Sequence, residues 1–228
     1  MLVKAKSIAI DGPVASGKTS VGLELARRLG YLFLDTGVMY RAVTLAVLQA
    51  GMDVQDENDV SALVTTLNIE VINPSLEDGR TNDVILNGED VTWDIRKKMV
   101  NDNVSTISTY KIVREVLTES QRKFGKGGEV VMVGRDIGTV VLPDADLKIF
   151  LKASVEERAR RRYDEERERG AVTSNHEILE NMKKRDALDS SRELAPLIIA
   201  QDAVLIDTNG KNLEEVVQEI IHLVSKEE

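Results

Sequence analysis

The sequence of 228 residues contains no cysteine, two histidines and only 4% aromatic residues. Without thiols the chain forms no disulfide, no thiolate metal site and no cysteine nucleophile. It has no run of about 18 or more apolar residues, the length that a transmembrane helix needs. Its first residues also lack the apolar segment and cleavage site of a signal peptide. We therefore expect a cytoplasmic protein without a membrane partner.

The chain has no excess of positive charge either: 39 acidic residues outnumber 30 basic ones, so the net charge is −9 and the isoelectric point is about 5.0. Proteins that bind nucleic acid polymers usually carry a basic surface, so we expect none as a partner. A small phosphorylated ligand is still compatible with this charge if arginines gather locally. A chain of this length buries one sizeable core, and we expect one domain, residues 1–228, acting as a monomer.

Short apolar runs alternate with amphipathic segments along most of the chain. The runs predict five strands: Lys6–Asp11, Tyr31–Leu34, Glu129–Val133, Leu147–Leu151 and Ala203–Asp207. The amphipathic segments and the capping boxes at Ser154 and Ser174 predict helices. These include Lys18–Leu29, Met39–Ala50, Asp94–Ser105, Tyr110–Phe124 and Asn212–Val224.

Between Asn68 and Thr92 the alternation of strand-like and helical segments gives way to short strand-like runs. These runs are joined by the hairpin-turn signals Glu77-Asp78-Gly79 and Asn87-Gly88. The sequence therefore predicts a three-layer α/β fold with a five-stranded parallel sheet, and a small antiparallel subdomain inserted at residues 68–100.

The segment from Gly12 to Thr19 matches the phosphate-loop pattern G-x-x-x-x-G-K-[ST] at every fixed position. Glycines let backbone N–H groups converge on an anion, and the following helix points its positive dipole end at the same place. We expect Lys18 to bind the outer phosphates of a nucleotide. We expect Thr19 to bind Mg²⁺ through its hydroxyl, with Ser20 as the other candidate. The expected nucleotide-binding residues are Gly12, Pro13, Val14, Ala15, Ser16, Gly17, Lys18, Thr19 and Ser20.

The alternative interpretation is a chance glycine-rich turn. The loop follows a predicted strand and opens a predicted helix, which favours the functional interpretation. The Asn-Lys-x-Asp motif with which GTPases read guanine is missing after the late strands.

Charged residues follow two of the predicted strands, at the edge where open α/β sheets bind ligands. Asp35, Thr36 and Arg41 follow the second strand, although the first two residues, taken alone, are better interpreted as caps of the next helix. Arg135 and Asp136 follow the third strand, between glycines.

A third group, Arg185, Asp189 and Arg192, has the spacing i, i+4, i+7 of one helix face. Taken alone, this spacing favours an exposed stripe of ion pairs over a binding site.

Four motifs together resemble the bacterial cytidylate kinases, nucleoside monophosphate kinases of the P-loop class, in order and spacing over nearly the whole chain. They are Asp11-Gly12-Pro13 with the phosphate loop, Leu34-Asp35-Thr36-Gly37 with Tyr40-Arg41, Gly134 to Val141, and Arg185 to Arg192. The resemblance implies transfer of a phosphoryl group from ATP·Mg²⁺ to CMP and dCMP, giving CDP and dCDP in pyrimidine nucleotide metabolism.

The resemblance also implies roles for single residues. Ser105, Arg114 and Asp136 would read cytosine, and Arg185 and Asp189 would hold the ribose. Arg41, Arg135 and Arg192 would hold the acceptor phosphate. Two positions depart from common patterns: Thr36 stands where many members have serine, and Thr19 stands where many nucleoside monophosphate kinases have glycine.

The segment Glu156 to Arg169 is rich in arginine and glutamate. We interpret residues 155–172 as a lid that closes over ATP and brings Arg158 and Arg161 to the transferring phosphate. The alternative is a solvated helix held by its own salt bridges.

Two other functions remain open. One is a kinase with a hydroxyl acceptor, such as a nucleoside or a shikimate-like molecule, in which Asp35 could act as the base. The other is a non-catalytic nucleotide-binding interaction protein. A phosphate acceptor needs no strong base, because its attacking oxygen is already an anion.

Overall fold

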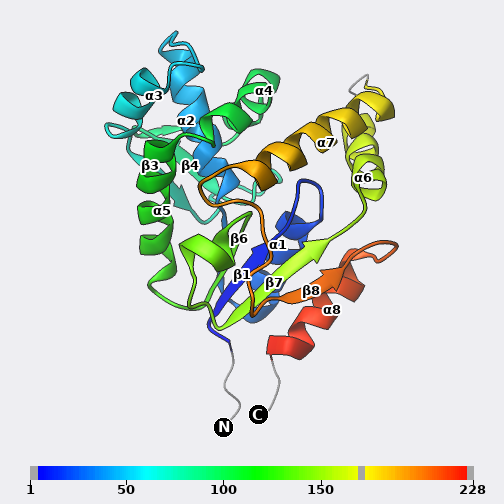
Figure 1. Cartoon of the computed structure of the whole chain (residues 1–228). Helices are drawn as coiled ribbons and strands as arrows, with labels where there is room; N and C mark the ends of the chain where they lie inside the picture. Colours follow the sequence, from blue (N-terminus) through cyan, green and yellow to red (C-terminus); the bar gives the residue numbers. More distant parts are fainter. Residues whose placement is uncertain (1–4, 169–172, 225–228) are drawn as a thin grey trace. The chain divides into compact units, whose positions relative to one another are not determined.

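A computed structural model of the chain describes residues 5–168 and 173–224. It divides into two compact units, Met1–Tyr31 with Gly128–Glu228, and Leu32–Gly127. Figure 1 shows the elements of both units in chain order.

The first unit is built on parallel strands. β1 pairs with β6 and β7, and β7 pairs with β8, all in parallel. The five-stranded sheet has the order β2-β6-β1-β7-β8. Four of these strands belong to the first unit: Ser7–Asp11 (β1), Val130–Gly134 (β6), Leu147–Lys152 (β7) and Val204–Asp207 (β8). The fifth, Leu32–Asp35 (β2), falls within the residue range of the second unit.

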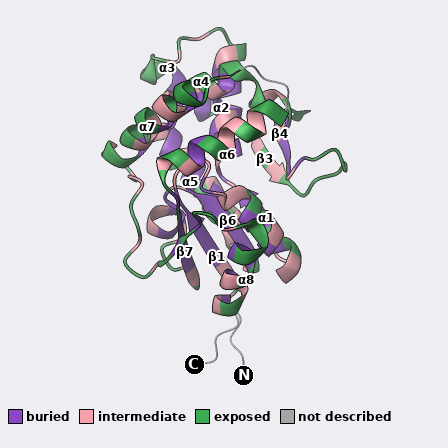
Figure 2. Cartoon of the chain, turned by 90° about the vertical axis from the view of Figure 1, so that its right-hand side faces the viewer, coloured by how far each residue is buried: buried purple, intermediate pink, exposed green. Residues whose placement is uncertain are grey.

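The apolar runs form strands here because a parallel strand is buried on both faces. Ile8 and Ile10 of β1 are fully buried, as is β6 along its length. Burying one such side chain contributes about 1.5–3 kcal/mol. Figure 2 shows β1 and β6 almost wholly in the buried colour.

Four α-helices and one π-helix complete the described part of the first unit. α1 (Lys18–Leu29) packs beside α8 (Leu213–Val224), and α6 (Val155–Glu168) packs beside α7 (Asn175–Ser191) (Figure 1). A π-helical turn, η2 (Ile137–Val141), follows β6.

The second unit contains a small antiparallel sheet, β3-β4-β5. Its helix α2 has buried residues on all sides, such as Val43 and Val47, and forms the centre of this unit's core. The elements are α2 (Gly37–Gln49), α3 (Glu57–Val64), β3 (Ile69–Ile72), β4 (Asp83–Leu86), β5 (Glu89–Asp90), η1 (Asp94–Arg96), α4 (Lys98–Ile107) and α5 (Lys111–Gly125).

These elements confirm the predicted α/β fold with its five-stranded parallel sheet and its antiparallel insert. The predicted single helix over Asp94–Ser105 is wrong, because Lys97 adopts ψ of 150° and separates η1 from α4. Helix α3 was not predicted from the sequence. The capping box predicted at Ser174 does not form, since its side chain makes no cap hydrogen bond.

Candidate active site

The phosphate loop joins β1 to α1 within the first unit. A Cβ at Gly12 would lie 2.4 Å from the Leu151 carbonyl oxygen and 2.8 Å from Ser16 Oγ, so only glycine fits. Gly17, at φ 93°, is the N-cap of α1 in the left-handed region that glycine adopts readily. The sequence motif thus folds into the tight turn that it predicts.

The N-terminus of α1 is suited to an anion. No side chain caps it and its first turn has no acidic residue, so its first N–H groups keep the positive end of the helix dipole uncompensated by a carboxylate. Lys18 Nζ donates to the Pro13 carbonyl at 2.9 Å, which places the ammonium over the loop. The loop therefore offers backbone donors and a cation to one phosphate group.

Asp11, the last residue of β1, lies directly before the loop and is 5% exposed. Its two carboxylate oxygens accept hydrogen bonds from the backbone N–H groups of Ile137 and Gly138, each at 2.8 Å. Burial raises the pKa of Asp11 to about 6, although the N–H groups of Gly138 and Ile137 and the nearby Lys18 oppose this effect. Asp136 adds to the rise through charge repulsion.

Two arginines and two aspartates gather where the segment after β6 meets the end of α7. Arg135 Nε lies 2.8 Å from Asp189 Oδ2, and two nitrogens of Arg192 lie 3.6 Å from Asp189 and 3.8 Å from Asp136. The side chains of these four residues are between 6% and 18% exposed. Opposite charges in this cluster compensate one another, as buried charges require.

The cluster decides between the two interpretations of the third charged group. Asp189 and Arg192 are buried, so the exposed stripe of ion pairs is wrong. The helical spacing is also wrong for Arg192, because α7 ends at Ser191 and Arg192 adopts an extended conformation. There Arg192 Nε donates to the Ala195 carbonyl at 2.6 Å. Arg185 lies on α7 one turn before Asp189.

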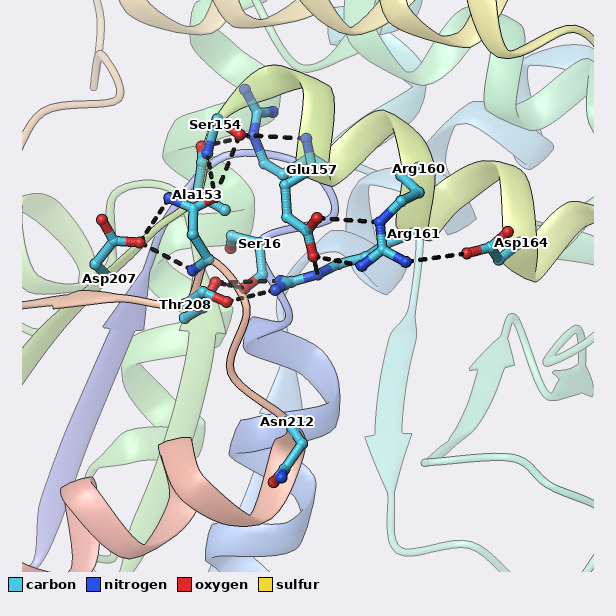
Figure 3. A network of polar contacts seen from close by, with 12 residues as sticks. Ser16, Ala153, Ser154, Glu157, Arg160, Arg161, Asp164, Asp207, Thr208 and Asn212 are labelled. Carbon is cyan, nitrogen blue, oxygen red and sulfur yellow. Dashed lines mark hydrogen bonds and ion pairs between the residues drawn. The ribbon is translucent and has the colours of Figure 1, made fainter.

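The arginines of α6 divide into two kinds. Arg158 is buried and donates to the carbonyls of Ala153 and Val14 and to Asp186 of α7. Arg161 donates to the hydroxyl and the carbonyl of Thr208, as Figure 3 shows. Both therefore border the phosphate loop, because Val14 belongs to it and the Thr208 hydroxyl lies 3.4 Å from the Ser16 carbonyl.

The exposed arginines of α6 follow the alternative interpretation. Arg160 is bound by Glu157 and Asp164 of its own helix, and Arg162 by Glu165 and Glu166. Residues 169–172, the end of the predicted lid, lie outside the described residues. Arg158 and Arg161 thus border the phosphate loop, whereas Arg160 and Arg162 form ion pairs within α6, as Arg161 also does with Glu157.

A cavity of about 150 Å³ opens beside the loop, lined by residues of α1, of the segment that joins β8 to α8, and of α6. Its wall includes Ser16, Gly17, Arg161, Thr208, Lys211 and Leu213. The cavity combines apolar side chains with a guanidinium group, a combination that suits a planar heterocycle.

The other predicted substrate residues belong to the second unit. Asp35 Oδ1 accepts from the Gly37 N–H at 3.0 Å and so caps α2, whereas the Thr36 side chain makes no cap hydrogen bond. Arg41 donates to the Ile95 carbonyl at 3.3 Å and to the Asn101 side chain.

Arg114 lies deeper in the same unit. It is buried on α5, donates to the Ser108 carbonyl at 3.1 Å and stacks 5.5 Å from the centre of the Tyr40 ring. Ser105 lies on α4, one turn before Ser108. These contacts hold a guanidinium group among largely apolar neighbours of α2 and α4.

A family model described as cytidylate kinase matches residues 8–226 of the chain. The chain belongs to the cytidylate kinase family. It is 48% identical to a cytidylate kinase of Herpetosiphon aurantiacus, covering 97% of this chain and 95% of the relative. It is 49% identical to a cytidylate kinase of Geobacillus kaustophilus, covering 96% of each chain.

A solved structure of an uncharacterized protein from Eubacterium ventriosum shares the fold, with a TM-score of 0.51 at 13% identity. The alignment covers 96% of this chain and 98% of that one. The resemblance found in the sequence motifs is confirmed by the family match, and with it the enzyme class, an ATP-dependent nucleoside monophosphate kinase.

In this cytidylate kinase family member, the structure brings together Arg135, Asp136, Asp189 and Arg192 in the first unit. Asp35, Thr36, Arg41, Ser105 and Arg114 lie in the second unit. Sequence reasoning gave no role to Asp11 or Thr208, whose functions depend on contacts with distant segments. The signal for Asp11 was a carboxylate at the end of an apolar strand, immediately before the loop.

Within the described ranges, the structure has no cluster of three or more His, Cys, Asp or Glu side chains that could hold a metal ion. None of the described helices combines the length and the apolarity needed to cross a membrane.

Proposed function

We propose that this kinase transfers the terminal phosphoryl group of ATP·Mg²⁺ to CMP and dCMP, giving CDP and dCDP. The observation that carries the proposal is the buried cluster of Arg135, Asp136, Asp189 and Arg192, which Asp11 joins to the phosphate loop. Paired guanidinium groups suit an acceptor phosphate, and carboxylates suit a ribose hydroxyl and the amine of cytosine.

When the acceptor nucleotide binds, its groups replace the ion pairs between the arginines and aspartates of this cluster. Its phosphate replaces carboxylates at Arg135 and Arg192, with Arg41 as a third ligand. Its sugar and base bring donors to the carboxylates, the ribose to Asp189 together with Arg185, and cytosine to Asp136 together with Ser105 and Arg114. Asp35 and Thr36 border the same substrate. The exchange keeps every buried charge compensated before and after binding.

The donor nucleotide fits the other side of the first unit. The residues Gly12 to Ser20 hold its phosphates, and the cavity beside Arg161 and Thr208 takes its base. Thr19 supplies a hydroxyl to Mg²⁺, which neutralises phosphate charge when it is bound. Lys18, with Arg158 and Arg161 of α6, stabilises the charge that grows on the transferring group.

Alignment and charge neutralisation then suffice for the reaction, because the attacking oxygen is an anion and needs no general base. The lid, residues 155–172, and the insert, residues 68–100, exclude water around the phosphates. We further propose that the kinase acts as a monomer on free nucleotides in the cytoplasm. Its net charge of −9 supports small nucleotides rather than polynucleotides as its partners.

The test is a steady-state assay of phosphate transfer from ATP to CMP, dCMP, UMP, cytidine and shikimate. We expect CMP and dCMP to be the best acceptors. Lys18→Ala should lower kcat by about 10²–10³-fold, the usual effect of removing one preorganised charge. The control Arg160→Ala, at an exposed position of α6, should keep the parental kcat.

Two results would contradict the proposal. Transfer to cytidine or shikimate but not to CMP would favour a kinase with a hydroxyl acceptor. ATP binding without transfer to any acceptor would favour a nucleotide-binding interaction protein.

A further inference from the structure

Asp11 has the most unusual environment of the buried carboxylates described above. It belongs to none of the groups that bind nucleotide in the proposed function, yet both of its oxygens are engaged by backbone donors of a segment more than 120 residues away. Because each oxygen accepts from a different N–H group, the contact fixes the orientation of the carboxylate as well as its distance from the two donors.

The chain segments on the two sides of this contact are proposed to bind different substrates. On one side, Asp11 is followed directly by Gly12, the first residue of the phosphate loop. On the other side, Ile137 and Gly138 directly follow Arg135 and Asp136. The carboxylate therefore links the segment proposed to hold the donor phosphates directly to the segment proposed to hold the acceptor.

The contact has little room for adjustment. A Cβ added at Gly138 would lie 3.3 Å from Asp11 Oδ2 and 3.2 Å from Lys148 Cδ. Lys148 is itself fixed, because its ammonium binds Asp202 at 2.9 Å. A tightly enclosed contact of this kind transmits a displacement rather than absorbing it.

A stabilising role alone explains this residue poorly. Its burial disfavours the charged form, which is why its pKa is raised to about 6. The charged groups that act on it are Lys18 of α1, which favours ionisation, and Asp136 before η2, which opposes it. A charged side chain that costs stability is typical of a residue kept for function.

We propose that Asp11 is a positioning residue that holds the Arg135–Asp136 turn in register with the phosphate loop, so that the two substrate phosphates meet in line. This inference rests on the proposed function, because it assumes that Arg135 and Asp136 bind the acceptor. Asp11 itself touches neither substrate.

The chain offers a matched control at the other end of the same strand. Asp146 accepts hydrogen bonds from the backbone N–H groups of Lys6 and Ser7, each at 2.8 Å, where β1 begins. Asp11→Asn and Asp146→Asn each replace a carboxylate that binds two backbone donors by an amide of the same size. In Asp11→Asn the amide keeps one acceptor oxygen and turns an NH₂ group toward the second donor, because the two donors bind different oxygens. In Asp146→Asn one amide oxygen can still accept from both donors, because Lys6 and Ser7 share a single oxygen.

The experiment measures kcat and KM for CMP and for ATP in the full-length wild type and both variants, together with thermal unfolding. For Asp11→Asn we expect kcat/KM for CMP to fall by about 10–100-fold, because a displacement of about 1 Å costs up to 10²-fold in rate. The KM for ATP should stay within about threefold, since the loop itself is unchanged. Asp146→Asn should keep the parental kinetics even where its unfolding temperature falls.

Gly138→Ala tests the same contact from its other side. Its added methyl group presses on Asp11 Oδ2, so we expect a raised KM for CMP without a matching change for ATP. This variant keeps the inference testable if Asp11→Asn does not yield folded protein.

Equal kinetics in Asp11→Asn and Asp146→Asn would overturn the inference, as would a loss in Asp11→Asn that affects ATP and CMP alike. A wild-type chain that transfers no phosphate to CMP would instead refute the proposed function. The two failures are therefore distinguishable in one set of assays.

Discussion

The buried carboxylate of Asp11 predicts an unusual dependence of stability on pH. Its pKa rises from the ordinary 3.8 to about 6 in the folded protein, chiefly because burial disfavours its charge. Between these two values the folded protein keeps a proton that the unfolded chain has released. The free energy of unfolding therefore falls as the pH rises through this window.

The magnitude follows from the separation of the two pKa values. A separation of about 2 pH units corresponds to a cost of about 3 kcal/mol, which is complete above about pH 6 and absent below about pH 4. Asn at this position does not titrate. The difference in unfolding free energy between Asp11→Asn and wild type should therefore become more positive by about 2 kcal/mol between pH 4.5 and 7.5.

Urea denaturation at several pH values measures this difference, because the other titrating groups are common to both proteins. Asp146→Asn supplies a control of opposite sign. Burial alone would raise the pKa of Asp146, but hydrogen bonds from Ser7 and Lys6 hold it below its usual value. Its ionised form therefore stabilises the fold, and this variant should lose stability relative to wild type as the pH rises toward the ordinary pKa of 3.8. Between pH 4.5 and 7.5 the difference for Asp146→Asn should change little, because this carboxylate is ionised in both the folded and the unfolded chain.

A difference between Asp11→Asn and wild type that is constant over this range would refute the reasoning. So would a difference that becomes more negative as the pH rises. Either result would mean that the two backbone donors outweigh burial, and that Asp11 stabilises the fold as an ordinary paired carboxylate.

Three further predictions concern the loop, the lid and the insert. Gly12→Ala places a methyl group against the Leu151 carbonyl and should destabilise the protein by about 1–3 kcal/mol, read from urea denaturation, and weaken ATP binding, read by calorimetry. Arg161→Ala removes a wall of the cavity beside the loop and should raise the KM for ATP by about 10-fold, whereas Arg160→Ala should leave it unchanged. Arg80→Met leaves three aspartates of the insert without their shared guanidinium group, so its unfolding temperature should fall, and should fall less at pH 4 than at pH 7.

The parts of the fold that depend on local sequence were predicted well. Strand limits were placed within one or two residues, and α1 was placed at its observed limits, Lys18–Leu29. Strong local signals explain this success: a run of apolar residues for a strand buried on both faces, and a glycine pair with lysine for the loop. Local sequence predicted the members of the four-residue cluster as separate groups, and only the family resemblance implied a shared acceptor phosphate for Arg135 and Arg192; the fold brings the four side chains together.

The misses have physical reasons in particular residues. α3 presents a short apolar stripe, with Val60 and Val64 buried, and its clearest signal was Asp56, whose side chain accepts from two N–H groups at its start. The helix expected over Asp94–Ser105 is interrupted at Lys97 although nothing in its residue types forbids a helix there. In both cases packing within the second unit outweighs weak local propensity.

The roles of Asp11 and Arg192 show which kind of information a single sequence withholds. The environment of a carboxylate depends on which donors reach it, and the N–H groups of Ile137 and Gly138 reach Asp11 because β1 and β6 pair in parallel and end side by side. Arg192 faces Asp136 and Asp189 because α7 ends one residue earlier and the chain turns there. Asp11 and Asp146 have the same side chain and the same number of backbone donors, yet their pKa values move in opposite directions, since burial dominates for one and hydrogen bonding for the other. Residue type therefore predicts which side chains can carry charge into the site. Whether a charged side chain raises or lowers stability depends on how deeply the fold buries it, and a sequence alone does not show this.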